Sequence, residues 1–234
     1  MKKILTIIAI IGTILIYSVN VMAVGIEEIN MNIEIPEEYY DLKSGIESND
    51  SKIEYYEAIL NVTKEDLISQ YEQNSILYNG INTNLSKEII ISRVESNITK
   101  NIFHLNTATA DKINEIKSLL IENAQLQNME VESQEEYICN NLLFINTIIH
   151  SEDRTIFQYY TIVNGSAITI SLNSSYTNTS NNELKEIIDT ISFEEILEKP
   201  TDYTNYIIYG ISVILIIMVI AIMILAFSGK KNKF

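Results

Sequence analysis

The side chains of this sequence that could take part in covalent or metal chemistry are two histidines and one cysteine. His104 and His150 stand 46 residues apart and match no metal-binding spacing such as H-E-x-x-H, so a shared metal site requires the fold to join them. Cys139 could act as a nucleophile beside His150, although a lone, half-buried cysteine more often serves packing. We therefore predict no catalytic residue and no metal site. If the protein were an enzyme, Cys139 and His150 would be the first residues to test.

Sequence motifs for nucleotide, phosphate or serine-hydrolase chemistry are missing. The chain contains no G-x-S-x-G, no G-x-x-x-x-G-K and no calcium-binding EF-hand loop. With 7 glycines in 234 residues, it has little material for the glycine-rich loops that cradle phosphate groups. These observations predict a protein that is not an enzyme and uses no cofactor.

Acidic pairs and tyrosines are the remaining candidates for a binding site. The pairs are Glu27-Glu28, Glu37-Glu38, Glu135-Glu136 and Glu194-Glu195. Adjacent side chains on a strand or helix point apart, so surface solvation is the main interpretation and calcium binding at one pair is the alternative. Core and sheet packing explains most of the 14 tyrosines, but several could line a groove for a peptide or glycan. The sequence names no ligand-binding residue.

The charge of the chain restricts its partners. Between Val24 and Asp202 there are 11 basic and 31 acidic residues, a net charge of about −20. Nucleic acid and anionic lipid are poor partners for such a surface, whereas cationic peptides, divalent ions or a basic protein face would suit it. The simpler interpretation is that acidity keeps an exported domain soluble. With Cys139 as the only cysteine, no internal disulfide can form.

The N-terminus has the pattern of a secretory signal peptide. Lys2 and Lys3 precede an apolar stretch over residues 4–17, and small residues, Val21 and Ala23, occupy the −3 and −1 positions of a cleavage after Ala23. We predict a signal peptide over residues 1–23, with an uncleaved signal anchor as the alternative. Both interpretations place the following residues outside the membrane.

The C-terminus has the pattern of a membrane anchor. No charged residue occurs in the 22 positions from Tyr206 to Phe227, which span ~33 Å as a helix, enough for a hydrocarbon core of ~30 Å. Tyr206 and Tyr209 suit one interface, and Lys230, Lys231 and Lys233 mark the cytoplasmic side. We predict an extracytoplasmic domain over 24–202, a transmembrane helix with its flanks over 203–229 and a basic cytoplasmic tail over 230–234.

The outer domain shows strand and helix patterns in alternation. We predict strands over 31–35, 53–60, 76–81, 85–94 and 142–149, extended chain or turn over 37–46, and no assigned element over 131–137. Helices are predicted over 63–74, with Thr63 as N-cap, over 111–127, and over the last apolar stretch from Leu184 to Ile191, after a capping box that starts at Ser180.

The clearest local pattern is a hairpin over residues 157–172. Asn164-Gly165 between two β-rich runs is typical of a two-residue type I′ turn, which pairs Val163 with Ser166 and makes every pair of facing residue numbers sum to 329. One face of this hairpin is apolar and the other is more polar. The pattern therefore predicts a sheet that is buried on one side and partly covered on the other.

The order of these elements resembles the PsbP-like fold, over residues 30–195. The resemblance rests on Ile33-Glu34-Ile35-Pro36-Glu37-Glu38-Tyr39, on Thr63-Lys64-Glu65-Asp66-Leu67 and on Gln158-Tyr159-Tyr160-Thr161-Ile162-Val163-Asn164-Gly165. It implies an α+β domain with an antiparallel β-sheet flanked by helices, an α/β sandwich, and a protein that acts by binding other proteins without catalysis.

Together these features predict a membrane-anchored extracytoplasmic domain that interacts with a protein or peptide partner in the cell envelope. The alternative is a ligand-binding sensor or transport accessory subunit that acts with a membrane partner. The sequence identifies neither the partner nor the oligomeric state.

Overall fold

The computed structural model describes residues 20–94, 101–151, 154–175 and 182–198. The predicted membrane span, with Tyr206, Tyr209, Phe227 and the lysines that follow it, lies outside these ranges, as does most of the predicted signal peptide. Within them, no helix combines the length and the apolar character that crossing a membrane requires. The signal peptide and the transmembrane helix therefore stay predictions.

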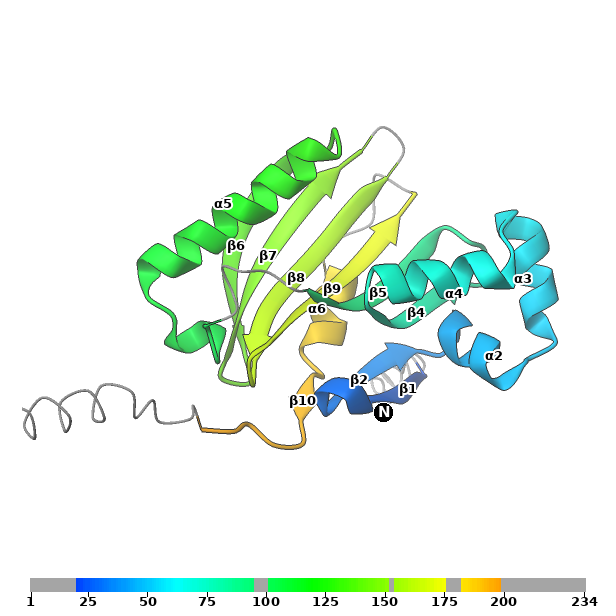
Figure 1. Cartoon of the computed structure of the whole chain (residues 1–234), viewed down its shortest axis with the longest axis horizontal. Coiled ribbons are helices and arrows are strands. Elements are labelled where there is room, and N and C mark those ends of the chain that lie inside the picture. Colours follow the sequence, from blue (N-terminus) through cyan, green and yellow to red (C-terminus); the bar gives the residue numbers. More distant parts are fainter. Residues whose placement is uncertain (1–19, 95–100, 152–153, 176–181, 199–234) are drawn as a thin grey trace, which may run out of the picture. The chain divides into compact units, whose positions relative to one another are not determined.

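Seven of the described strands form one antiparallel sheet, in the order β3-β4-β5-β9-β8-β7-β6 (Figure 1). In chain order they are β3 (Tyr39–Asp41), β4 (Ile76–Asn82), β5 (Lys87–Val94), β6 (Glu130–Cys139), β7 (Leu142–His150), β8 (Thr155–Val163) and β9 (Ser166–Ser174). A smaller sheet, in the order β1-β2-β10, contains β1 (Val21–Ile26), β2 (Met31–Pro36) and β10 (Ser192–Phe193).

The helices pack around the large sheet. They are α2 (Leu42–Ser48), α3 (Lys52–Leu60), α4 (Lys64–Gln73), α5 (Ala110–Leu126) and α6 (Asn182–Ile188), with short 3-10 helices η1 (Glu27–Ile29) and η2 (Leu105–Thr107). Helix α5 lies along β6, α2 and α4 lie against β4, and α6 contacts β2 (Figure 1). The predicted α+β class, an antiparallel sheet flanked by helices, is confirmed.

Both faces of the large sheet are buried near β8. On one face Phe157 and Tyr159 pack with Ile33 of β2 and Leu184 of α6. On the other face Tyr160 packs with residues that include Ile116 of α5. Because side chains alternate along a strand, this hairpin separates two cores.

A third apolar cluster fills the corner where α2, α3 and α4 meet β4. Its buried members are Leu42, Ile46, Ile53, Tyr56, Leu67, Tyr71 and Ile81. Helix α4 begins at a capping box: the Thr63 hydroxyl accepts from the Asp66 N–H, and the Asp66 carboxylate accepts from the Thr63 N–H. The predicted N-cap at Thr63 is thus confirmed.

The predicted hairpin is also confirmed. Thr155 pairs with Ser174 and Val163 with Ser166, so the register sums to 329 along its whole length. Asn164 and Gly165 have φ values of 53° and 77°, as a type I′ turn requires.

Residues 53–60 form a helix, so the predicted strand there is wrong. Ile53, Tyr56 and Leu60 follow the i, i+3, i+7 spacing of a helix face and pack into the third cluster, while Tyr55 and Ile59 are exposed. The β-branched and aromatic content of this stretch suggested a strand, but the periodicity of its apolar residues decides in favour of α3.

Three other stretches differ from expectation in detail. Residues 131–137, left unassigned, belong to the edge strand β6, and the predicted extended stretch becomes helix α2 at Leu42, because Asp41 caps it. Ser180 of the predicted capping box lies outside the described residues. The predicted cleavage site falls within β1, where Ala23 pairs with Glu34; cleavage there would leave residues 24–26 of this strand.

Candidate functional site

The two histidines lie at opposite ends of strand β8. His150 pairs with Thr155, where β8 starts, whereas the His104 ring accepts from the Asn164 N–H, just past the end of the strand. At about 3.3 Å per residue, the nine residues between these points separate them by roughly 25–30 Å. The histidines therefore share no metal site. No group of three or more potential metal ligands gathers anywhere in the described part of the chain.

Cys139 and His150 are likewise far apart. They lie at opposite ends of the β6–β7 pair, where Cys139 faces Leu142 and His150 faces Glu130. The thiol donates to the Ile188 carbonyl at 3.7 Å, and its burial, with a further contribution from Asp189, raises the pKa of Cys139. A protonated thiol far from His150 serves packing, so the structure does not assemble the nucleophile pair considered from the sequence.

His104 has a structural role next to the hairpin turn. Its Nε2 lies 2.8 Å from the Leu197 carbonyl, and its Nδ1 accepts from the Asn164 N–H at 3.3 Å. The Asn164 side chain donates to the Glu195 carbonyl at 2.8 Å and accepts from the Leu197 N–H at 2.9 Å. We call His104, Asn164 and residues 195–197 the hairpin clasp. Since Nδ1 accepts, Nε2 must donate, so the imidazole is neutral.

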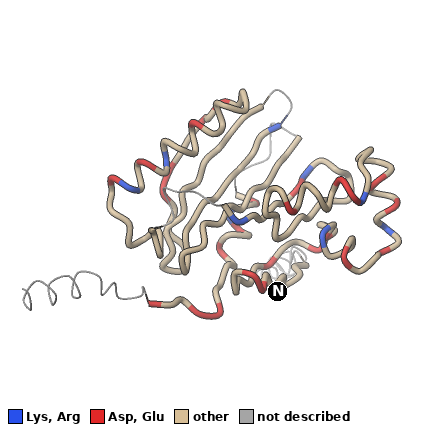
Figure 2. The backbone as a smooth tube through the Cα atoms, viewed as in Figure 1, with Lys and Arg blue, Asp and Glu red and all other residues tan. Residues whose placement is uncertain are grey.

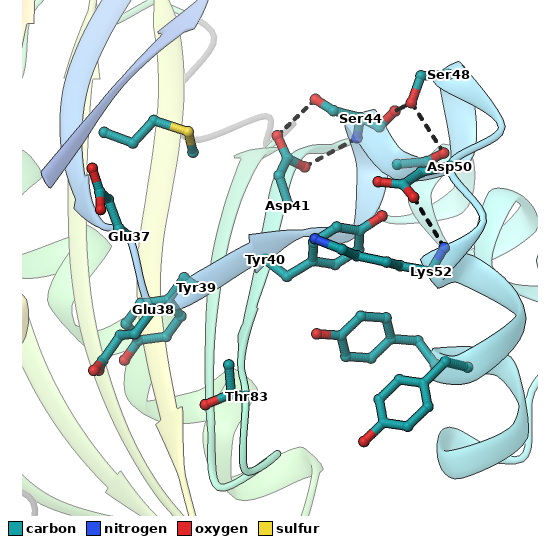
Figure 3. Close-up of a pocket in the computed structure, with 14 residues that line it drawn as sticks. Glu37, Glu38, Tyr39, Tyr40, Asp41, Ser44, Ser48, Asp50, Lys52 and Thr83 are labelled. Atoms are coloured by element: carbon teal, nitrogen blue, oxygen red, sulfur yellow. Dashed lines mark hydrogen bonds between the residues drawn. The ribbon is translucent and has the colours of Figure 1, made fainter.

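An open hollow among the described residues lies where the β2–β3 turn, α2 and α3 meet, with a volume of about 620 Å³ (Figure 3). We call it the acidic groove. Its lining residues are Met22, Glu37, Glu38, Tyr39, Tyr40, Asp41, Ser44, Gly45, Ser48, Asp50, Lys52, Tyr55, Tyr56 and Thr83. Its lining thus includes four carboxylates, one ammonium group and four tyrosines.

Three of the four tyrosines of the groove form a stacked group. The rings of Tyr40 and Tyr56 are parallel within 11° and 4.8 Å apart, and Tyr55 meets Tyr56 edge-on at 5.4 Å. The Tyr40 hydroxyl packs over Gly45 of α2, where a Cβ atom would overlap it. Tyr56 is anchored in the third cluster, while Tyr55 is 59% exposed. One buried ring therefore holds two others at the surface.

The Tyr40 hydroxyl lies in a partly closed environment. Its oxygen is shut off from solvent and has no partner of good hydrogen-bond geometry within the described ranges. Burial raises the pKa of Tyr40 to about 12, and the nearby Asp50 carboxylate adds to the rise. The phenol is therefore neutral at physiological pH, so the ring presents an uncharged aromatic face.

The carboxylates of the groove are of two kinds. Asp41 accepts from the Ser44 N–H at 3.0 Å and caps α2, and Asp50 accepts from the Lys52 N–H at 3.0 Å, a bond that lowers the pKa of Asp50. Glu37 and Glu38 are exposed and form no ion pair with any described residue. They lie in the turn after Pro36 rather than on a strand, so both reach the same hollow.

A second, smaller hollow of about 240 Å³ shares Glu38 with the groove. Here Lys87 is already paired with Glu183 at 2.5 Å, and the Tyr39 hydroxyl donates to the same glutamate at 2.6 Å. Acidic residues also outnumber basic ones over the rest of the described chain (Figure 2). Negative charge alone therefore does not distinguish the acidic groove; its stacked tyrosines do.

Comparison with known proteins adds information on the fold alone. No protein-family model matches the chain, and no curated protein is significantly similar to it in sequence. The solution structure of cyanobacterial PsbP from Synechocystis sp. PCC 6803 matches with a TM-score of 0.47 and 9% identity, over 75% of this chain and 93% of that one. The Ran-binding protein Mog1p of Saccharomyces cerevisiae matches with a TM-score of 0.43 and 11% identity, over 75% and 96%.

A Pseudomonas aeruginosa protein of unknown function, PA94, matches more weakly, with a TM-score of 0.34 and 12% identity over 78% of this chain and 99% of that one. The PsbP-like resemblance drawn from the sequence is thus found again at the level of the fold. We base no functional argument on these distant similarities.

Proposed function

We propose that this chain is a non-catalytic interaction domain that binds a protein or peptide partner through the acidic groove. The proposal rests on one observation: an open hollow of about 620 Å³ that is lined by four tyrosines, four carboxylates and a single lysine. Tyrosine is enriched at binding hot spots, because its ring supplies a large apolar area and its hydroxyl a polar contact. The excess of carboxylates favours a partner segment rich in Lys or Arg.

The chemistry of the groove supports a binding role. Its lining contains no histidine and no cysteine, and the phenol of Tyr40 is neutral at physiological pH. A groove with neither a base poised near pH 7 nor an activated nucleophile suits recognition better than bond cleavage. The acidity of the domain also disfavours nucleic acid as the partner.

We further propose that the domain lies outside the cytoplasmic membrane, anchored by residues 206–227, and that its partner is an envelope protein. This part of the proposal is supported by the uncharged C-terminal stretch and by the lysines that follow it. Protease added to intact cells should digest the domain and spare the tail. The mass of the N-terminal peptide will show whether the chain begins at Met1 or at Val24.

A small cationic ligand is the second candidate, which would make the protein a sensor or transport accessory subunit. The volume of the groove falls in the range of about 300–1,000 Å³ that small-molecule sites occupy, and stacked tyrosines can hold an organic cation. Saturable calorimetric binding of such a cation, without binding of basic peptides, would favour this candidate.

Site-specific photo-crosslinking tests the proposal in cells. A photoreactive phenylalanine analogue at Tyr55, which is 59% exposed in the groove, should capture one envelope protein through a basic segment. The same analogue at Leu126, 74% exposed at the end of α5, is the matched control and should not capture that protein. Replacing Glu37 and Glu38 by Gln should weaken the Tyr55 product. Equal capture from both positions would contradict the proposal.

A further inference from the structure

The single lysine of the acidic groove lies over an aromatic ring. The Lys52 ammonium is 5.1 Å from the centroid of the Tyr40 ring, and Figure 3 shows its side chain crossing that ring. Tyr56, which stacks on Tyr40, is buried, whereas Lys52 is exposed, so the ammonium lies on the open side of the stack. A cation within ~6 Å of a tyrosine ring is attracted by the negative face of the ring.

Lys52 is held there by the ring and by the charge of the nearby Asp50 carboxylate, whose pKa it helps to lower. Its side chain forms no ion pair with any carboxylate in the described part of the chain, although four carboxylates line the groove. Its backbone N–H, which donates to Asp50 at 3.0 Å, fixes the start of α3 independently of the side chain. The long, exposed side chain can therefore leave the ring without disturbing the helix.

The ring itself is fixed in place. The Tyr40 hydroxyl packs over Gly45, and its ring is parallel to Tyr56 at 4.8 Å. The open face of Tyr40 is thus a preformed surface for a cation, with the Asp50 carboxylate close to its edge. Such a surface would accept the ammonium or guanidinium of another chain as readily as that of Lys52.

We propose that the open face of Tyr40 is the subsite for a Lys or Arg side chain of the partner, and that Lys52 occupies this subsite in the free protein. The partner's cation must then displace Lys52, which acts as an internal competitor. This inference rests on the proposed function, because it assumes that a basic segment enters the acidic groove. To the proposed function it adds that the basic side chain of the partner contacts the Tyr40 ring, and that Lys52 weakens this contact.

The chain offers a charge-matched control. Lys43 of α2 pairs with Glu28 at 3.5 Å and with Glu47 at 3.6 Å, and it does not line the groove. Lys43→Gln and Lys52→Gln remove the same unit of positive charge, but only Lys52→Gln vacates the ring. Lys52→Arg keeps a cation over Tyr40, and Tyr40→Leu removes the ring that both cations need.

The test is a titration of the full chain, in detergent micelles at physiological salt, against a fluorescein-labelled octapeptide with four arginines. Lys52→Gln should bind the peptide about two- to fivefold more tightly than the unchanged protein, the range that a displaced exposed cation–π contact implies. Lys43→Gln should change the affinity by less than this, and Lys52→Arg should bind as the unchanged protein does. In the Tyr40→Leu background, Lys52→Gln should raise the affinity for the peptide by no more than Lys43→Gln does.

The outcomes separate the inference from the proposal beneath it. Equal gains from Lys52→Gln and Lys43→Gln, or a Lys52→Gln gain that persists without the Tyr40 ring, would overturn the inference and leave the groove as the binding site. If neither the unchanged protein nor Lys52→Gln binds the peptide, the proposed function fails, and the inference with it. If Tyr40→Leu does not fold, the affinities of Lys52→Gln, Lys52→Arg and Lys43→Gln still show whether Lys52 competes with the peptide.

Discussion

The hairpin clasp and the acidic groove differ in whether their polar groups are bonded within the protein. In the clasp, both ring nitrogens of His104 and both polar atoms of the Asn164 amide bond to the backbone, and His104 is only 7% exposed. In the groove, Glu37 and Glu38 face solvent without an ion pair among the described residues. Polar groups that are satisfied internally stabilise the fold, whereas those left open remain available to a partner.

The largest effect should come from truncating one aromatic ring in each region. Phe157→Ala, at a buried position of the hairpin, should cost about 3–5 kcal/mol of unfolding free energy, because removal of the ring leaves a cavity. Tyr55→Ala in the groove should change stability by less than about 0.5 kcal/mol and should weaken binding of a basic peptide instead. Urea unfolding and peptide titration of both variants check that one loses stability and the other loses affinity. A large stability loss in Tyr55→Ala would show that this ring, like Phe157, serves the fold.

A smaller effect is expected at the clasp itself. Asn164→Ala loses two side-chain bonds to residues 195–197 and places Ala at a φ of 53°, so it should cost roughly 2–3 kcal/mol. Amide hydrogen exchange over residues 194–198 should accelerate, while peptide affinity stays unchanged. The exposed Asn123→Ala on α5 serves as the control. Unchanged exchange at residues 194–198 would show that the clasp does not hold this segment.

The cap of α4 should have a still smaller effect. Thr63→Ala removes the acceptor for the Asp66 N–H and should cost about 1 kcal/mol. Because Thr63 does not line the groove, the affinity for a basic peptide should not change. Thr63→Ser, which keeps the hydroxyl, should restore the thermal midpoint. A loss of affinity in Thr63→Ala would mean that the groove depends on α4 more than its lining suggests.

Acid should destabilise the corner around the groove gradually. The backbone N–H of Lys52 lowers the pKa of Asp50, and hydrogen bonds from Thr63 lower the pKa of Asp66. Since the folded-state pKa values lie below the unfolded ones, both carboxylates stabilise the fold above about pH 4, and this contribution is lost as the pH falls through the folded values. Thermal midpoints between pH 5 and pH 3 measure the decline. Asp50→Asn and Asp66→Asn should flatten it; an unchanged slope would contradict this origin.

The sequence predicted the hairpin well because its determinants are local. Asn164-Gly165 specifies a turn with two positive φ values, and the register of β8 and β9 follows from the turn. The same reasoning did not reach His104, whose two partners lie 60 and 93 residues away along the chain. Only the fold brings these groups together.

The groove was missed for two reasons. The predicted strand over residues 53–60 places Tyr55 and Tyr56 on opposite faces, whereas the i, i+3, i+7 spacing of Ile53, Tyr56 and Leu60 indicates a helix. Adjacent side chains point apart on a strand, but Pro36 ends β2 directly before Glu37 and Glu38, and both residues occupy a turn. Tertiary contacts then place both beside Tyr40.

Hydrogen exchange with and without a basic peptide tests the central claim most directly. The full chain in detergent micelles would be mixed with a saturating octapeptide of four arginines, and an octapeptide of four glutamates would serve as the control. The account predicts slower exchange over residues 37–56, around the groove, and no change over residues 157–172 or 194–198. Protection that appears at the hairpin, or equally with the acidic peptide, would contradict the assignment of the groove as the binding site.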